Sequence, residues 1–237
     1  SDPTGEYSLP WQAVTTGIAY NLKATGGKEL TSVADLWDPA LKGKISMLTE
    51  MRDTIGLIAM SEGIDISTAN TIEQYQPAFD TLKEQVDNGQ IRQFTGNEYV
   101  GPLEDGSLAA CFAWSGDVLG MENPDIRYVV PDSGGTLWFD AMVIPKGASN
   151  VDDVAEWMNF VYDPVNAAQI TAAVQFISPV QGVQEQLRKM GGEDAALADN
   201  PLLFPDDATK ARLHTFANLS DDQEAKFDEE FSKISGA

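Results

Sequence analysis

Acidic side chains occur in three segments at the ends of predicted strands or within them, and two of these segments also carry a tryptophan two or three residues away. The three segments are Leu48-Thr49-Glu50-Met51-Arg52-Asp53, Trp114-Ser115-Gly116-Asp117 and Trp138-Phe139-Asp140. Because residues i and i+2 of a strand point to the same face, Trp138 and Asp140 should lie side by side. An indole beside a carboxylate can receive an organic cation through cation–π attraction and charge-assisted hydrogen bonds. The residue types therefore favour a cation-binding site.

The same carboxylates allow other interpretations. A pair of acids suits glycoside hydrolysis, provided that the two groups stand about 5 to 9.5 Å apart around a sugar-shaped cleft. Glu50 and Asp53 also fit the first turn of a helix, where the macrodipole favours acids and Arg52 can pair with either one. A tryptophan near an aspartate can simply be core packing beside a solvated charge.

The sequence contains few residues that could support thiol or imidazole chemistry. The single cysteine, Cys111, lies in the apolar run Ala109-Ala110-Cys111-Phe112-Ala113, and the single histidine, His214, is remote from it in the sequence. Neither an internal disulfide nor a four-ligand thiolate zinc site can form. A buried Cys111 is expected, because a nucleophile needs a neighbouring base. We therefore expect no catalytic residue, no bound metal and no cofactor.

The charge balance narrows the choice of partner. Among 237 residues, 37 Asp and Glu oppose 15 Lys and Arg, which gives a net charge of −22. Such a field repels phosphate backbones and anionic lipids, so we expect no nucleic-acid partner, and binding to a membrane surface is disfavoured. The apolar runs are much shorter than the 20 or so residues of a transmembrane helix, so no membrane insertion is expected. Solubility or a salty environment explains the acidity equally well.

Short apolar runs alternate with amphipathic stretches, which predicts an α/β fold. Strands are expected at 14–21, 44–48, 91–94, 108–114, 127–130 and 136–144. Helices are expected at 32–37, 52–63, 71–88, 99–105, 117–122, 151–162, 165–174, 179–190, 207–219 and 221–234. In open α/β sheets ligands lie beyond the carboxyl ends of the strands, where the three acidic segments fall.

Several of these segments, in this order and spacing, resemble one family. They are Tyr7-Ser8-Leu9-Pro10-Trp11, Thr16 to Asn21, Ser32 to Lys44 (SVADLWDPALKGK), the Leu48–Asp53 segment, Trp114-Ser115-Gly116, and Gly134 to Asp140 (GGTLWFD). Together they resemble the spermidine/putrescine-binding extracytoplasmic proteins of bacterial ABC transporters, from Tyr7 to about Ala237. The resemblance implies a periplasmic-binding-protein type II fold, a two-lobed venus flytrap whose polyamine lies in an interlobe cleft between aromatic walls and carboxylates.

The resemblance also assigns ligand positions residue by residue. Trp114, Trp138 and Asp140 match the family's ligand-binding positions, and Asp53 matches the second acid of the Leu-Thr segment. Glu50 is the candidate for the first acid, because this chain is one residue shorter there. Two further candidates depart from the family: Phe176 replaces a binding tyrosine and so loses a hydroxyl, and Asp117 replaces a neutral residue. A late glutamine contact has no equivalent, although Phe216 lies near its place.

The family also implies how the chain is divided. Residues 1–13 would be a crossing segment, 14–137 the second lobe, 138–185 the returning part of the first lobe and 186–237 the C-terminal helices of the second lobe. Family members carry about 100 further residues before the Tyr7 segment, a piece the size of a lobe. The chain opens without methionine, so we expect a protein whose upstream part was removed or lies elsewhere.

We therefore expect a non-enzymatic, extracytoplasmic substrate-binding component of an ABC importer. Its partners would be a polyamine, spermidine or putrescine, and the permease subunits of the transporter. It would act in the periplasm or, with a lipid anchor, at the cell surface. The alternatives are a binder of another small organic cation in the same fold, and a carboxylate-dependent glycoside hydrolase.

Overall fold

The computed structural model describes residue 2 and residues 4–236, which form two compact units. Unit 1 contains the chain up to Val14 together with Trp138–Asp207, and unit 2 contains Thr15–Leu137 together with the residues from Ala208 onward. The chain therefore passes from one unit to the other three times. The strands β1 (Leu9–Asn21) and β6 (Gly135–Met142) each contain one of these passages.

Unit 2 holds most of the sheet. Its other strands are β2 (Ile45–Leu48), β3 (Ile91–Thr95), β4 (Ala110–Trp114), β5 (Ile126–Val129) and β7 (Leu213–His214). Over the described residues the strand order is β3-β2-β4-β1-β6-β7, with β5 also pairing with β1. The pairs β2–β3, β2–β4 and β6–β7 are parallel, whereas β1 is antiparallel to β4 and β5. This mixed sheet with helices confirms the expected α/β class.

Capping residues precede two helices of unit 2, at Thr71 and Ser220. The helices of this unit are α1 (Met51–Ser61), α2 (Ile72–Asp87), α3 (Val100–Glu104), α4 (Ser115–Leu119) and α10 (Asp221–Ser235), with 3-10 turns at Val33–Trp37, Pro39–Leu41 and Asn97–Tyr99. The expected cap at Ser32 is confirmed, because Ser32 and Asp35 form a capping box. Thr71 and Gln74 form a second one before α2. Reciprocal bonds of this kind satisfy the free N–H groups of a first turn.

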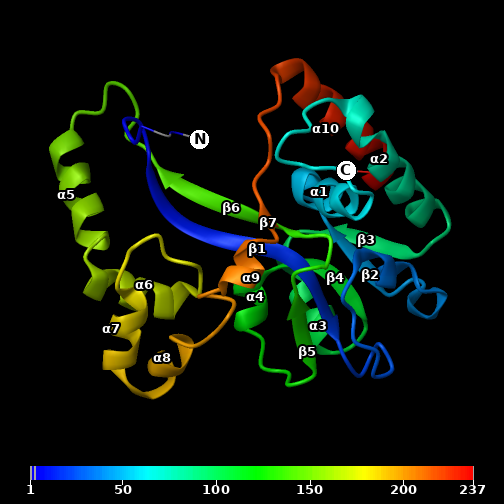
Figure 1. Cartoon of the computed structure of the whole chain (residues 1–237), viewed down its shortest axis with the longest axis horizontal. Helices are drawn as coiled ribbons and strands as arrows, with labels where there is room; N and C mark the ends of the chain where they lie inside the picture. Colours follow the sequence, from blue (N-terminus) through cyan, green and yellow to red (C-terminus); the bar gives the residue numbers. More distant parts are fainter. Residues whose placement is uncertain (1, 3, 237) are drawn as a thin grey trace. The chain divides into compact units, whose positions relative to one another are not determined.

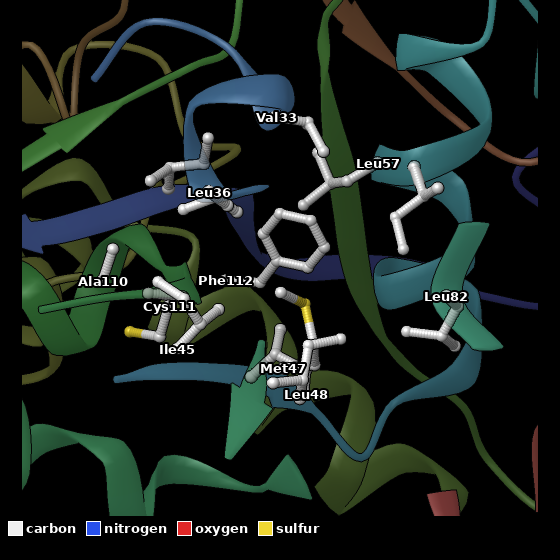
Figure 2. Packing of buried hydrophobic residues seen from close by; sticks show 14 of the residues in the cluster. Val33, Leu36, Ile45, Met47, Leu48, Leu57, Leu82, Ala110, Cys111 and Phe112 are labelled. Carbon is white, nitrogen blue, oxygen red and sulfur yellow. The ribbon is translucent and has the colours of Figure 1, made fainter. Parts of the chain in front are cut away.

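The core of unit 2 forms around β4. Phe112 has no exposed surface and lies centrally among the labelled apolar side chains, with Met47 and Leu48 from β2 on one side and Val33 on another (Figure 2). The uninterrupted apolar run of β4 is typical of a strand covered on both faces. Helices α1, α2 and α10 lie against one another in unit 2 (Figure 1), where the Phe227 ring meets Tyr75 edge-on at a centroid distance of 4.9 Å. These three helices therefore share one apolar core with β2 and β4.

Unit 1 is smaller and mostly helical. Its helices are α5 (Val151–Val161), α6 (Pro164–Val174), α7 (Val183–Met190) and α8 (Gly192–Leu197), and the short α9 (Asp207–Lys210) begins at its last residue. Helices α6, α7 and α8 pack side by side (Figure 1) around Ala168, Leu187 and Ala198, each of which is completely buried. Residues 186–207 therefore group with unit 1. The sequence analysis places a lobe boundary between residues 185 and 186, which lie within α7. The division into compact units keeps the whole of α7 in unit 1.

The most exposed large apolar side chains among the described residues all lie in unit 1. They are Tyr7, Phe139, Val143, Val151, Trp157, Phe160, Val165, Val174 and Met190. Two-stranded sheets and single apolar helix faces are marginal in water without further cover. Unit 1 thus presents apolar surface that unit 2 does not.

Three predicted helices are wrong in part. The helix expected at 117–122 lies at Ser115–Leu119. The helix expected at 207–219 ends at Lys210, because the backbone of Gly135 donates to the Arg212 carbonyl at 2.9 Å and β7 then pairs with β6. The helix expected at 179–190 begins only at Val183, and α8 was not expected. The first strand starts earlier than expected, at Leu9. Long-range strand pairing overrides the local helical pattern at 207–219.

Candidate functional site

The site in unit 2 is centred on Asp53, in the first turn of α1. Its side chain is 1% exposed. The Trp114 Nε1–H group donates to Oδ2 at 3.0 Å, and the Thr136 hydroxyl donates to Oδ1 at 2.6 Å. A carboxylate also suits the N-terminal turn of a helix, where the macrodipole is positive. Asp53 thereby joins α1, the carboxyl end of β4 and β6.

Trp114 ends β4 and is half-buried. Besides the indole bond to Asp53, its backbone N–H donates to the Tyr99 hydroxyl at 3.0 Å, and the two rings are tilted with centroids 6.5 Å apart. The indole is thus held at its nitrogen and at its backbone. A ring fixed in this way offers a preformed face to a cation.

Asp117 lies on α4, three residues beyond Trp114, and is half-buried. The Tyr99 hydroxyl donates to its Oδ2 at 2.7 Å. Burial raises the pKa of Asp117 above its usual range, and the bond from Tyr99 opposes that shift. Burial and the neighbouring Asp117 charge also raise the pKa of Tyr99, so its hydroxyl keeps the proton it donates. A carboxylate partly withdrawn from water attracts a cation more strongly than a solvated one.

Glu50 stands apart from this network. It is exposed, directly precedes α1 and accepts a hydrogen bond from the Thr49 hydroxyl at 3.0 Å. Arg52 donates to the Ala217 carbonyl at 2.6 Å, and its guanidinium lies 4.8 Å from the centre of the Phe216 ring. Burial lowers the pKa of Arg52. Arg52 therefore anchors the segment after β7 to α1.

In unit 1 the candidate residues lie on β6 and after α6. Trp138 is half-buried and Asp140 is exposed, and their spacing places them on one face of β6. Phe176 is half-buried and follows Gln175, a left-handed residue with φ of 62° that ends α6. Ile177 then pairs with Ala13, with hydrogen bonds of 2.8 and 2.9 Å. That pairing sets the position of Phe176 relative to β1.

The sequence analysis does not identify Tyr99 or Thr136 as residues of the site. Tyr99 is fully buried and precedes Trp114 by 15 residues, so no local pattern connects the two. Thr136 lies within the Gly134-Gly135-Thr136 stretch that carries the family resemblance, and this signal could have singled it out.

The described residues show neither a metal-binding cluster nor an accessible thiol. They contain no cluster of three or more His, Cys, Asp or Glu side chains placed to hold a metal ion. Cys111 is fully buried, and burial raises the pKa of its thiol far above neutrality. An inert thiol of this kind is a packing residue. Of the helices in the described part of the chain, none combines the length and the apolar character that crossing a bilayer demands.

Comparison with known proteins gives a consistent result. A family model described as bacterial extracellular solute-binding protein matches residues 1–209. The spermidine/putrescine-binding periplasmic protein of Escherichia coli K12 is 26% identical over 210 residues, covering 88% of this chain and 58% of that protein. The putrescine-binding periplasmic protein PotF of the same organism is 24% identical over 234 residues, covering 90% of this chain and 60% of the relative.

Solved structures agree. The spermidine/putrescine ABC transporter substrate-binding protein PotD from Streptococcus pneumoniae superimposes with a TM-score of 0.83 at 26% identity, covering 99% of this chain and 70% of that one. The chain thus spans about three-fifths of the length of the curated relatives it matches. These matches confirm the resemblance and the binding-protein fold expected from the sequence.

Proposed function

The chain belongs to the bacterial extracellular solute-binding proteins, and on that premise we propose that it is the polyamine-binding component of an ABC importer. The family consists of binding proteins, so the glycoside hydrolase alternative is set aside. The names of the relatives support spermidine or putrescine as the ligand.

The main observation in favour of a polyamine ligand is the pairing of indole rings with carboxylates. In unit 2 the Trp114 ring lies beside Asp53 and near Asp117, and in unit 1 Trp138 shares a face of β6 with Asp140. A polyamine has ammonium groups joined by methylene chains, so it needs both kinds of side chain. Each unit supplies an aromatic surface and an anionic group.

Unit 2 corresponds in this proposal to the second lobe, and unit 1 to the returning part of the first. The exposed apolar side chains of unit 1 support the second assignment, as does a hollow of about 360 Å³ lined partly by Tyr7, Leu9, Met142 and Met158. Further strands of a longer chain would cover that surface. A periplasmic or surface location and a permease partner follow from the same proposal, in keeping with the periplasmic relatives.

Calorimetric titration of the full-length protein with spermidine and putrescine tests the function. Micromolar or tighter binding is expected, and heat-silent titration with every linear polyamine would refute the proposal. Binding of a compact cation, such as choline, in preference to both polyamines would instead support the rival ligand class of the same fold.

Asp140 carries the residue-level prediction. Asp140→Asn keeps the shape and removes the charge, and a charge-assisted hydrogen bond contributes about 1.5–3 kcal/mol. Affinity should fall by about 10- to 150-fold, since 1.4 kcal/mol is a factor of ten. Glu84→Gln, at an exposed carboxylate of α2 in unit 2, is the control for net charge and should leave affinity unchanged. Equal effects of the two variants would contradict a role for Asp140 in contacting the ligand.

A further inference from the structure

Asp53 is placed to act on Trp114 more directly than on a ligand. With 1% of its surface exposed, the carboxylate has almost no access to an ammonium group in solvent. Both of its oxygens accept hydrogen bonds within unit 2, one from the Trp114 indole and one from the Thr136 hydroxyl. The Trp114 side chain, in contrast, is only half-buried.

We propose that Asp53 is a positioning residue that orients and polarises the Trp114 indole, and that it influences a bound cation through that ring instead of by contact. This inference rests on the proposed polyamine-binding function. It also departs from the assignment that the family resemblance implies, in which Asp53 would meet the ligand directly.

The geometry supports a fixed orientation of the ring. The bond from Nε1 to Oδ2, 3.0 Å long, restricts rotation of the indole about its side-chain torsions. The shorter bond from Thr136, 2.6 Å, holds Oδ1 and so keeps the carboxylate itself from turning. Tyr99 fixes the backbone of the same tryptophan. The ring is thus held by groups from three segments that are distant in the sequence.

The chemistry of the bond also bears on cation binding. An indole N–H that donates to a carboxylate makes a charge-assisted bond, which withdraws the proton slightly and leaves more electron density on the ring. Cation–π attraction grows with the negative charge on the ring face. The Asp53 charge therefore strengthens the receptor face of Trp114 while staying buried.

Within this site the acid with greater access is Asp117. It is half-buried, and Tyr99, which donates to Asp117, also accepts from the Trp114 backbone. Neutralising Asp117 should therefore weaken polyamine binding more than neutralising Asp53 does.

Asp53→Asn is the decisive variant, because asparagine can keep the hydrogen bonds to Trp114 and Thr136 while removing the charge. The asparagine oxygen can accept from the Trp114 indole while its amide donates to the Thr136 hydroxyl oxygen, which is able to accept. The charge disappears and the ring stays in place. Asp53→Leu has a similar volume but removes the hydrogen bonds from Trp114 and Thr136, and it tests the orientation of the ring itself.

Two readouts in the full-length protein are needed: the affinity for putrescine and the proton chemical shift of the Trp114 indole N–H, assigned by its loss in Trp114→Phe. We expect a two- to fivefold loss of affinity in Asp53→Asn, with an upfield shift of the indole signal because a neutral acceptor bonds more weakly. Asp53→Leu should lose at least fivefold more than Asp53→Asn, and its indole signal should exchange faster with solvent.

A tenfold or greater loss in Asp53→Asn with an unmoved indole signal would overturn the proposal, because it would mean that Asp53 meets the cation through its charge. An indole signal unaffected by Asp53→Leu would overturn it as well. If Asp53→Leu does not fold, Asp53→Asn decides on its own by the same criteria. If the wild-type protein binds no polyamine, the proposed function fails, whereas the indole shift still tests the coupling of Asp53 to Trp114.

Discussion

Removing the Tyr99 hydroxyl should destabilise unit 2 and disturb the site together. Tyr99 is fully buried, and its oxygen makes two bonds, donating to Asp117 at 2.7 Å and accepting from the Trp114 N–H at 3.0 Å. Tyr99→Phe keeps the ring and deletes both bonds. A bond to a charged group contributes about 1.5–3 kcal/mol, and a buried N–H left without an acceptor costs about 1–3 kcal/mol.

These two effects share one atom, so they should not add in full. We expect a loss of about 2–4 kcal/mol in the free energy of unfolding, which lowers Tm by roughly 4–16 °C for a chain of this size. Urea titration followed by tryptophan fluorescence measures the free energy, and polyamine titration of the same variant measures the site.

Tyr75→Phe is the matched control for this variant. Tyr75 is also buried in unit 2, but its hydroxyl makes a long bond of 3.4 Å to the Ala69 carbonyl. Its removal should cost less than about 1 kcal/mol, because bonds of that length are weak. If Tyr99→Phe were no more destabilising than Tyr75→Phe, the network around Trp114 would not contribute as described.

Two further predictions concern the same unit. Asp117→Asn should raise the free energy of unfolding at pH 7. Burial raises the pKa of Asp117, so between the usual and the raised pKa the native state binds more protons than the unfolded chain. The stability of the wild-type protein therefore falls as pH rises through that window, and the asparagine variant avoids this loss. Urea titrations at several pH values should show the advantage of the variant vanishing below the usual carboxyl range, and a loss of stability at pH 7 would contradict this. Gly17→Ala should cost about 1–3 kcal/mol, because the added Cβ would lie 2.5 Å from the Val129 carbonyl oxygen in the β1–β5 pair. Gly101→Ala, which meets no atom within 4 Å, should be neutral or stabilising in the same melting experiment, and equal losses in the two variants would rule out the steric explanation.

Local patterns in the sequence determined most of the elements. The apolar run before Trp114 predicted a buried strand, and the spacing of Tyr75, Phe79 and Leu82 predicted the buried face of α2. The Ser32–Asp35 capping box was also predicted, because both of its partners lie within one turn. These features depend on neighbours a few residues away, which a sequence displays directly.

The candidate site was predictable in its residue types and not in its connections. The indole and carboxylate residues were found because they recur at strand ends and match a family pattern. Their roles differ: Asp53 is buried and bonded to Trp114, Glu50 is exposed, and Asp117 is held by Tyr99. The ligand roles of Trp138, Asp140 and Phe176 stay predictions.

Tertiary structure decided what depends on residues far apart in the chain. Asp53 meets Trp114 across 61 positions and Thr136 across 83, and no periodicity encodes such separations. The stretch at 207–219 has a helical pattern, yet Leu213 and His214 pair with β6, because the hydrogen bonds of a sheet edge outweigh a weak local preference. The sequence by itself determined which acidic and aromatic residues stand near strand ends. Folding decided that Asp53 is buried and bonded to the Trp114 indole, whereas Asp117 keeps partial exposure and Asp140 is exposed.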